Sequence, residues 1–169
     1  MDETTFSLEF PLRGCWMKRG QQRTYPAHTS LRQQAHLIGA LDWASATVHT
    51  QTVERKHSET FIEFLEWLCL EVYPDDPLLL VLDNVSYHRS APVLAFLSLL
   101  QPRLQVLWLP KYSPDMNLIE RYWLHLKNLV YANRLFSSLT HLLDHIQLCV
   151  EVQNMVDHPY RLSFAKSFR

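Results

Sequence analysis

The chain has 169 residues, of which 47% are hydrophobic, and its formal net charge at pH 7 is −1. This length suits one domain with a substantial core, and no apolar stretch is long enough to span a bilayer. Three widely spaced cysteines argue against a disulfide framework and favour a reducing compartment. We therefore expect a soluble, cytoplasmic protein with a single domain over residues 1–169.

The first part of the chain predicts an antiparallel meander. Residues 5–10 alternate apolar and polar side chains, which is typical of a strand with one buried face. Residues 35–53 predict two further strands joined by a turn at 42–45. Asp2 and Glu3 stand at the start of the first strand.

The second part predicts helices alternating with buried strands. Residues 57–73 keep apolar side chains at helical spacing, and the glutamates Glu59, Glu63 and Glu66 occupy the opposite side. The remaining predicted elements are strands at 78–82 and 105–109, and helices at 90–101, from Asn117 onward, and at about 138–153. This order predicts the α/β class, with a mixed sheet flanked by helices.

Acidic residues follow the two buried strands of this second part. Asp83 comes directly after LLLVL at 78–82, and Glu120 lies beyond the strand at 105–109, in the first turn of the next helix. In open α/β sheets, functional sites gather at the carboxyl ends of the strands. A buried carboxylate needs a partner, and the nearest downstream basic residue after Asp83 is Arg89, six positions on. A divalent metal held by Asp83 and Glu120 is therefore our working hypothesis.

Two motifs around these acids resemble those of a known family. Asp83, Asn84 and His88 form the pattern strand-Asp-Asn-x-x-x-His, and LPKYSPDMNLIE occupies residues 109–120. Together they resemble the mariner-type bacterial insertion-sequence transposases, which have a DDE catalytic triad and a ribonuclease-H-like core. The family's second motif is close to Leu-Pro-x-Tyr-Ser-Pro-Asp-x-Asn-Pro-x-Glu, and this chain departs from it at Leu118, where proline is usual.

The resemblance implies a reaction and a third acid. The family carries its first catalytic aspartate in an Asp-Glu pair on the first core strand, which selects Asp2. Asp2, Asp83 and Glu120 would then hold two Mg²⁺ ions, for which Mn²⁺ can substitute. The implied reaction is DNA cleavage at the terminal inverted repeats of a transposon, followed by transfer of the freed 3′-hydroxyl into target DNA. A homodimer is a further assembly that the resemblance allows.

The resemblance also indicates a missing part. The family has an upstream helix-turn-helix region, which this sequence does not contain, and only Met1 precedes Asp2. We therefore expect a truncated first strand and a catalytic-domain fragment, one product of a split reading frame, or a decayed copy. Weak or absent cleavage by this chain alone is the corresponding expectation.

Basic residues gather in the part that contains the motifs. Residues 54–83 hold eight acids and two bases, whereas residues 84–143 hold six bases and two acids. A positive potential around the site suits DNA phosphates, although ordinary solvated side chains explain the same charges. The residues expected beside the triad or on the DNA path are Asn84, His88, Arg89, Lys111, Asn117, Arg121 and Lys127.

Several alternatives stay open at this stage. Asp42 is a rival for the first acid, although an aspartate in a turn usually bonds the backbone. Asn117 and Glu120 also fit a capping box, in which the glutamate would only bond the backbone of the cap. A decayed or repurposed domain without activity is one alternative function. A haloacid-dehalogenase-type phosphatase is another, although Val85 stands where its second aspartate should be.

Overall fold

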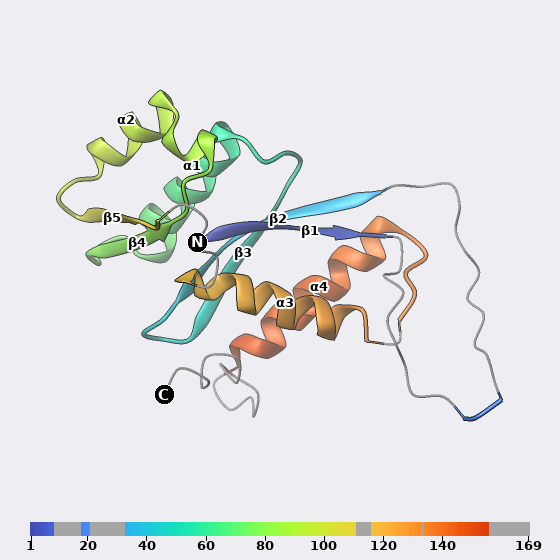
Figure 1. The fold of residues 1–169 in the computed structure, drawn as a ribbon. Helices are drawn as coiled ribbons and strands as arrows, with labels where there is room; N and C mark the ends of the chain where they lie inside the picture. Colours follow the sequence, from blue (N-terminus) through green and yellow to red (C-terminus); the bar gives the residue numbers. More distant parts are fainter. Residues whose placement is uncertain (9–17, 21–32, 111–115, 133, 156–169) are drawn as a thin grey trace.

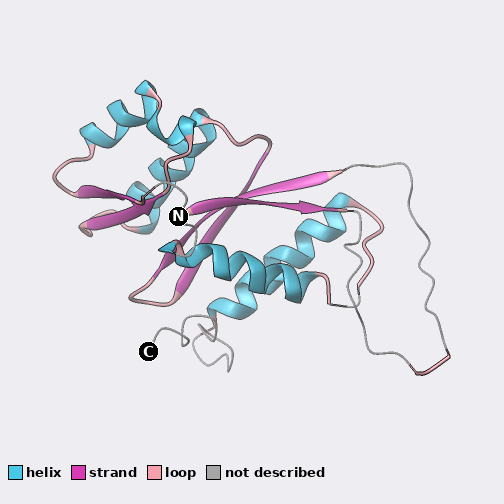
Figure 2. Cartoon of the chain, viewed as in Figure 1, coloured by secondary structure: helices cyan, strands magenta, loops and turns pink. Residues whose placement is uncertain are grey.

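The structure is a computed structural model, and it describes residues 1–8, 18–20, 33–110, 116–132 and 134–155. Its strands and α-helices follow one another as β-β-β-α-β-α-β-α-α, which confirms the predicted order. Figure 1 shows two groups of elements that meet near the amino terminus, and Figure 2 shows helices against each group of strands. No helix among the described residues has both the length and the apolar character needed to cross a membrane.

The first group of strands is an antiparallel sheet in the order β1-β2-β3, formed by β1 (Asp2–Ser7), β2 (Gln34–Asp42) and β3 (Thr47–Val53). It confirms the predicted meander and its turn. The first strand starts earlier than the expected residue 5, so that Asp2 and Glu3 lie within β1 rather than before it. Residues 9–10, which belong to the predicted strand, lie outside the described part.

The second group is a parallel pair, β4 (Leu78–Leu82) and β5 (Leu104–Trp108). The crossover between them runs through a 3-10 turn, η2 (Ser86–Arg89), and the helix α2 (Ala91–Leu99). A parallel neighbour requires such a connection, because the chain must return to the starting edge of the sheet.

The helix before β4 changes its winding at its end. α1 (Ser58–Trp67) passes directly into a π-helical turn, η1 (Leu68–Val72), and the two together cover most of the predicted helix. His57 caps α1 by accepting the Thr60 backbone N–H on its Nδ1, and Thr60 Oγ1 accepts the His57 N–H in return.

Each sheet has its own core. α3 (Leu118–Val130) and α4 (Leu139–Asn154) pack with the meander around Phe6, Leu37 and Trp123. α1 and α2 pack with β4 and β5 around Phe61 and Leu82, and this second core also receives Met1 and Ile38 from the meander. The apolar stripe predicted for α3 is buried as expected, at Ile119, Tyr122, Trp123, Leu126 and Val130.

The two sheets meet at the start of β1. The amino group of Met1 donates a hydrogen bond of 3.0 Å to the carbonyl oxygen of Val81 in β4. Side chains alternate along a strand, so Asp2, Thr4 and Phe6 face α3 whereas Met1 and Glu3 face α1. The amino-terminal strand therefore contributes an acid to each side of the sheet.

Candidate active site

Asp2 lies opposite Gly39 in the β1–β2 register, on the face that α3 covers. Burial is the main cause that raises the pKa of Asp2 to about 6, and the negative charges of Glu3 and Glu120 contribute to the same shift. Glu120 belongs to the first turn of α3, so its charge acts on Asp2 from the neighbouring element.

Two contacts hold α3 in this position. Asn117, the residue before the helix, is buried, and its side-chain amide donates a hydrogen bond of 3.2 Å to the carbonyl oxygen of Met1. Gly39 lets the helix approach, because a Cβ atom there would lie 2.6 Å from Cη2 of Trp123. Trp123 is about one helical turn from Glu120. The close packing of Trp123 on Gly39 therefore also fixes the position of Glu120 relative to the meander.

The Asn117 side chain does not act as a helix cap. α3 has no side-chain capping bond from Asn117, whose amide is used on Met1 instead. In the capping box that the sequence allowed, the Asn117 side chain would bond the backbone of the first helical turn, and this bond is absent. Glu120 itself is exposed, and it acts electrostatically on Asp2 across the helix–strand interface.

Asp83 follows β4 directly and is held by a histidine rather than by an arginine. Its Oδ1 lies 2.7 Å from Nδ1 of His88 and accepts the Val85 backbone N–H at 3.3 Å. Burial alone would raise the pKa of Asp83, but the hydrogen bond and charge of His88 hold that pKa below its usual range. The short turn η2 folds His88 back onto Asp83, so the partner of this carboxylate is His88 rather than Arg89.

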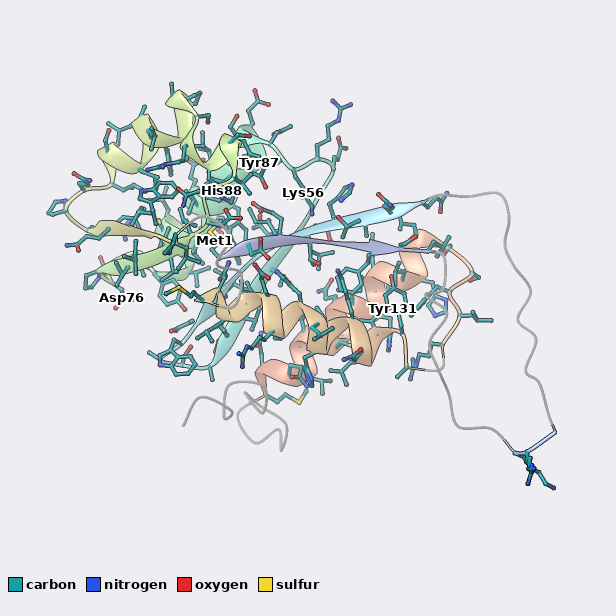
Figure 3. All side chains as sticks on the ribbon, viewed as in Figure 1. Met1, Lys56, Asp76, Tyr87, His88 and Tyr131 are labelled. Atoms are coloured by element: carbon teal, nitrogen blue, oxygen red, sulfur yellow. The ribbon has the colours of Figure 1, made fainter. Side chains whose placement is uncertain are left out.

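His88 also contacts an acid that the sequence argument missed. Its Nε2 lies 3.0 Å from Oε1 of Glu3, whose side chain is only 5% exposed. Burial lowers the pKa of His88, yet the two carboxylates outweigh burial and raise that pKa to about 9. The ring of His88 packs on Phe61, with 4.1 Å between ring centroids. Figure 3 labels His88 beside Tyr87, whose ring centroid lies 4.6 Å from that of His88. Glu3, His88 and Asp83 therefore form a carboxylate–imidazolium–carboxylate bridge from β1 to the end of β4, with His88 and Glu3 buried and Asp83 partly exposed.

The alternation of side chains along the first strand could have identified Glu3 as a buried acid that needs a partner. Alternation along β1 puts Glu3 and Asp2 on opposite faces, and a carboxylate turned into a core requires a donor. Tyr87 supplies a second hydrogen-bond donor to Glu3 through its hydroxyl group. Burial, together with the charges of Glu3, Asp83 and Asp2, raises the pKa of Tyr87.

The three predicted acids come from three elements, Asp2 from β1, Asp83 from the end of β4 and Glu120 from α3. Asp2 and Glu120 act on each other, and Asp2 and Asp83 both act on the amino group of Met1, whose pKa burial lowers to about 6. Within the described residues, no three His, Cys, Asp or Glu side chains are arranged tightly enough to form a metal cluster. The donor set nevertheless suits Mg²⁺, since it consists of carboxylate oxygens. The pKa of Asp2 is raised mainly by burial and also by the charges of Glu3 and Glu120, and a cation would offset both effects.

The other predicted residues lie in different settings. The side-chain amide of Asn84 donates to the carbonyl oxygen of Leu109 and so joins the ends of β4 and β5. Arg89 is exposed, with its guanidinium 4.7 Å from the ring centroid of Trp108. Lys127 lies 5.6 Å from the ring of Phe6. Lys111 lies outside the described residues.

Arg121 and Lys127 are both on α3 with Glu120. Seven residues separate Glu120 from Lys127, which amounts to about 700° of rotation and roughly 10 Å of rise. Lys127 therefore lies on the same side of α3 as Glu120. Glu59, Glu63 and Glu66 are exposed on α1, which packs with the other sheet.

Asp42, the rival first acid, lies in the β2–β3 turn. It accepts hydrogen bonds from the Ala44 N–H, the Ser45 hydroxyl and the Tyr73 hydroxyl, at 2.8, 2.5 and 2.9 Å. Burial would raise the pKa of Asp42, but these bonds hold it below its usual range. Asp42 therefore organises the turn, as is usual for an aspartate there.

Comparison with known proteins agrees with this architecture. The model of the DDE superfamily endonuclease family matches residues 1–143. The insertion element IS630 uncharacterized 39 kDa protein of Shigella sonnei is 28% identical over 150 residues, which cover 89% of this chain and 43% of that protein. The chain thus spans less than half the length of this curated relative.

Two solved structures share the fold. The Mos1 transposase paired-end complex with left transposon end superposes with a TM-score of 0.70 at 18% identity, covering 89% of this chain and 46% of that one. The Mos1 mariner paired end complex with Mn gives a TM-score of 0.61 at 18% identity, covering 89% and 51%. The fold is therefore the ribonuclease-H-like transposase core, and nothing supports the phosphatase alternative. On the match of its family model, the chain belongs to the DDE superfamily endonucleases.

Proposed function

We propose that this chain is the catalytic domain of an insertion-sequence transposase, which cleaves DNA strands at transposon ends and transfers the 3′-hydroxyl into target DNA. The match of the DDE superfamily endonuclease model to residues 1–143 carries the proposal, and the positions of Asp2 on β1, Asp83 directly after β4 and Glu120 on α3 support it. The IS630 relative, the Mos1 complexes with transposon ends and the complex with Mn support it. The protein would act on DNA in the bacterial cytoplasm, at the nucleoid.

Asp2, Asp83 and Glu120 would hold two Mg²⁺ ions, with Mn²⁺ able to substitute. When bound, the ions supply activation of an attacking oxygen and stabilisation of a leaving oxygen in displacement at phosphorus. The protein's part is to keep the carboxylates ionised and in place. His88 does this for Asp83, since it holds one carboxylate oxygen and lowers the pKa of the group. Asn117 does it for the start of β1, because it fixes the Met1 carbonyl.

Metal binding provides a test that does not depend on cleavage. We expect MnCl₂ or MgCl₂ to raise the melting temperature of the whole chain, because a ligand that binds only the folded state stabilises it. Asp83→Asn and Glu120→Gln should each remove this rise. Asp42→Asn is the matched control and should retain it. A rise that survives both Asp83→Asn and Glu120→Gln would contradict the assignment of the ligands.

Cleavage is measured on a supercoiled plasmid with the same variants. Metal-dependent nicking should be lost in Asp83→Asn and Glu120→Gln and kept in Asp42→Asn. If Asp42→Asn abolishes nicking and Asp2→Asn does not, then Asp42 is the first acid. A chain that binds metal but does not nick under any condition would favour the decayed or repurposed domain.

DNA binding is tested through its salt dependence. Arg121 and Lys127 would contact phosphates along α3, so changing both to alanine should reduce the slope of log affinity against log salt by about 1 to 2. Lys56→Ala is the control, because Lys56 is exposed on the loop before α1, as Figure 3 shows. An equal loss of slope in both variants would contradict the proposed DNA path.

A further inference from the structure

The outer edge of the meander is β3, the last strand in the order β1-β2-β3. A groove of about 340 Å³ runs between this edge and α4. Val48, Thr50 and Thr52 of β3 line one side of it, and residues of α4 between Leu143 and Asn154 line the other. We call this feature the edge groove.

The register of the meander decides which backbone groups of β3 point toward the edge groove. The Leu8 N–H bonds the Gln33 carbonyl at 2.9 Å, so the odd residues of β2 bond to β1 and its even residues bond to β3. These even residues stand opposite the odd residues of β3. The even residues of β3, which are Val48, Thr50 and Thr52, therefore direct their N–H and C=O groups away from β2.

The side chain of Asn154 takes the place of a neighbouring strand at Val48. Its Oδ1 accepts the Val48 N–H at 2.9 Å, and its Nδ2 donates to the Val48 carbonyl at 2.8 Å. Among the residues that the structure describes, the backbone groups of Thr50 and Thr52 have no such partner. Two consecutive hydrogen-bonding positions of the edge thus stay open, and an open edge is a template for an extended polypeptide.

The α4 side of the edge groove is acidic. Asp144, Gln147 and Glu151 are exposed, and their spacing puts them on one face of the helix. Gln147 Nε2 donates to Glu151 Oε1 at 3.0 Å, which positions this carboxylate without neutralising it. The lining contains no lysine or arginine, and neither acid forms a salt bridge within the described part of the chain. The groove therefore suits a positively charged ligand.

We propose that the edge groove binds a basic, extended segment of another polypeptide, which adds to β3 as an antiparallel strand. Two alternate residues of the segment would stand opposite Thr52 and Thr50 and exchange N–H···O=C bonds with them. Thr52 lies opposite Leu37, which packs in the core with α3 and α4, so side chains at these positions point to the α4 side. Lysine or arginine at every second position would therefore reach Asp144 and Glu151.

The charge of the edge groove favours such a segment over a second copy of this chain. Two-fold pairing of β3 with itself would place the α4 helices of both copies on the same side of the joined sheets. The acids of the two edge grooves would then face each other, and like charges across an interface cost free energy. This inference does not depend on the proposed function, because the edge of β3 is separated from β1 by β2.

The experiment adds the peptide acetyl-Lys-Val-Lys-Val-Lys-Val-Lys-amide to the full chain. At saturation it should slow hydrogen exchange by at least about tenfold at the amides of Thr50 and Thr52, because these amides gain a partner. The amides of His49 and Gln51, which already face β2, serve as internal references. The acidic peptide acetyl-Glu-Val-Glu-Val-Glu-Val-Glu-amide should give no protection.

Backbone methylation of the peptide tests the pairing itself. Methyl groups on the lysine nitrogens remove the N–H groups that face β3, so this peptide should give no protection. Methyl groups on the valine nitrogens, which point away from β3, are the matched control and should leave the protection in place.

Charge variants test the α4 side, with binding measured by the fluorescence anisotropy of a labelled peptide. Asp144→Asn combined with Glu151→Gln should weaken binding by at least about fivefold. Glu59→Gln combined with Glu63→Gln is the matched control, because it removes the same charge from exposed positions on α1. This control pair should bind nearly as the parent does.

Four results would overturn the proposal. The first is no binding at about 1 mM peptide, or unchanged exchange of Thr50 and Thr52 at saturation. The second is an equal effect of the two methylated peptides, because binding would then not use the edge. The third is equal weakening by the two pairs of charge variants. The fourth is protection of these amides without peptide that rises with protein concentration, which would assign the edge to a second copy.

Discussion

At the residue scale, the site depends on two adjacent acids that have different roles. Asp2 and Glu3 are neighbours in the sequence, yet the strand turns one toward α3 and the other toward α1. Glu3 is paired with His88 and Tyr87, whereas Asp2 has its pKa raised to about 6 by burial, with Glu3 and Glu120 adding to the shift. Glu3, whose hydrogen-bond partners are in place, supports the fold. Asp2, whose pKa is raised, is the acid suited to a cation.

The pairing of Glu3 leads to a stability prediction. Glu3→Ala should lower the free energy of unfolding by about 1–3 kcal/mol, because it leaves a buried imidazole nitrogen without its partner. Glu3→Gln should cost less, since the amide oxygen can still accept from Nε2 of His88. Urea denaturation measures both, with the exposed Glu54→Ala as the control expected to stay within about 0.5 kcal/mol of the parent. Equal losses for alanine and glutamine would show that the hydrogen bond contributes nothing.

At the scale of elements, the position of α3 on the meander decides where Glu120 stands. The helix approaches β2 closely at Gly39, where a methyl group would overlap the Trp123 ring. The Asn117 amide fixes the start of the same helix on the Met1 carbonyl. Both contacts lie within one turn of Glu120, so the packing of the helix and the geometry of the acidic group are coupled.

This coupling can be measured by a double-mutant cycle. Gly39→Ala should cost about 1–3 kcal/mol of stability, because the helix must move away from the sheet. Trp123→Phe removes the ring atoms that the new methyl would meet, so the double variant should lose less than the sum of the single losses, by about 1 kcal/mol. Gly39→Ala should also reduce the metal-induced rise in melting temperature. Strict additivity of the two losses would mean that Gly39 and Trp123 do not interact.

The β2–β3 turn gives a pH prediction at the same scale. The pKa of Asp42 is lowered in the folded chain, so its hydrogen bonds stabilise the protein fully above the unfolded pKa of about 3.9 and are lost as pH falls through the folded pKa. The parent should therefore be more stable than Asp42→Asn at about pH 6. The difference should shrink as pH falls below about 3.9 and through the folded pKa, as urea denaturation at several pH values can measure. A gap of constant size over this range would contradict the assignment.

At the scale of the whole molecule, activity depends on how well the start of β1 is supported. Asp2 follows a residue held by two hydrogen bonds, from Met1 N to Val81 and from Asn117 to Met1 O. A carboxylate must be held within about 0.5 Å to work in a metal site.

We therefore expect Asn117→Ala, which removes the hydrogen bond to the Met1 carbonyl, to weaken metal-dependent nicking of a supercoiled plasmid. Asp42→Asn, which leaves both hydrogen bonds of Met1 in place, is the control and should nick as the parent does. Equal nicking by Asn117→Ala and the parent would show that this hydrogen bond is not needed to hold Asp2.

The sequence by itself determined the order of the elements and the place of the acids. Unbroken apolar runs followed by Asp83 predicted a buried strand ending at a site, and helical spacing predicted the buried stripe of α3, because burial requires these periods whatever the partner is. Tertiary structure alone decided the partners. His88 reaches Asp83 because η2 folds back, Glu3 meets His88 because β1 crosses the end of β4, and Asn117 bonds Met1 across 116 positions of sequence. Such contacts depend on how separate elements pack against one another. Local periodicity carries no information about which residues far apart in the sequence come into contact.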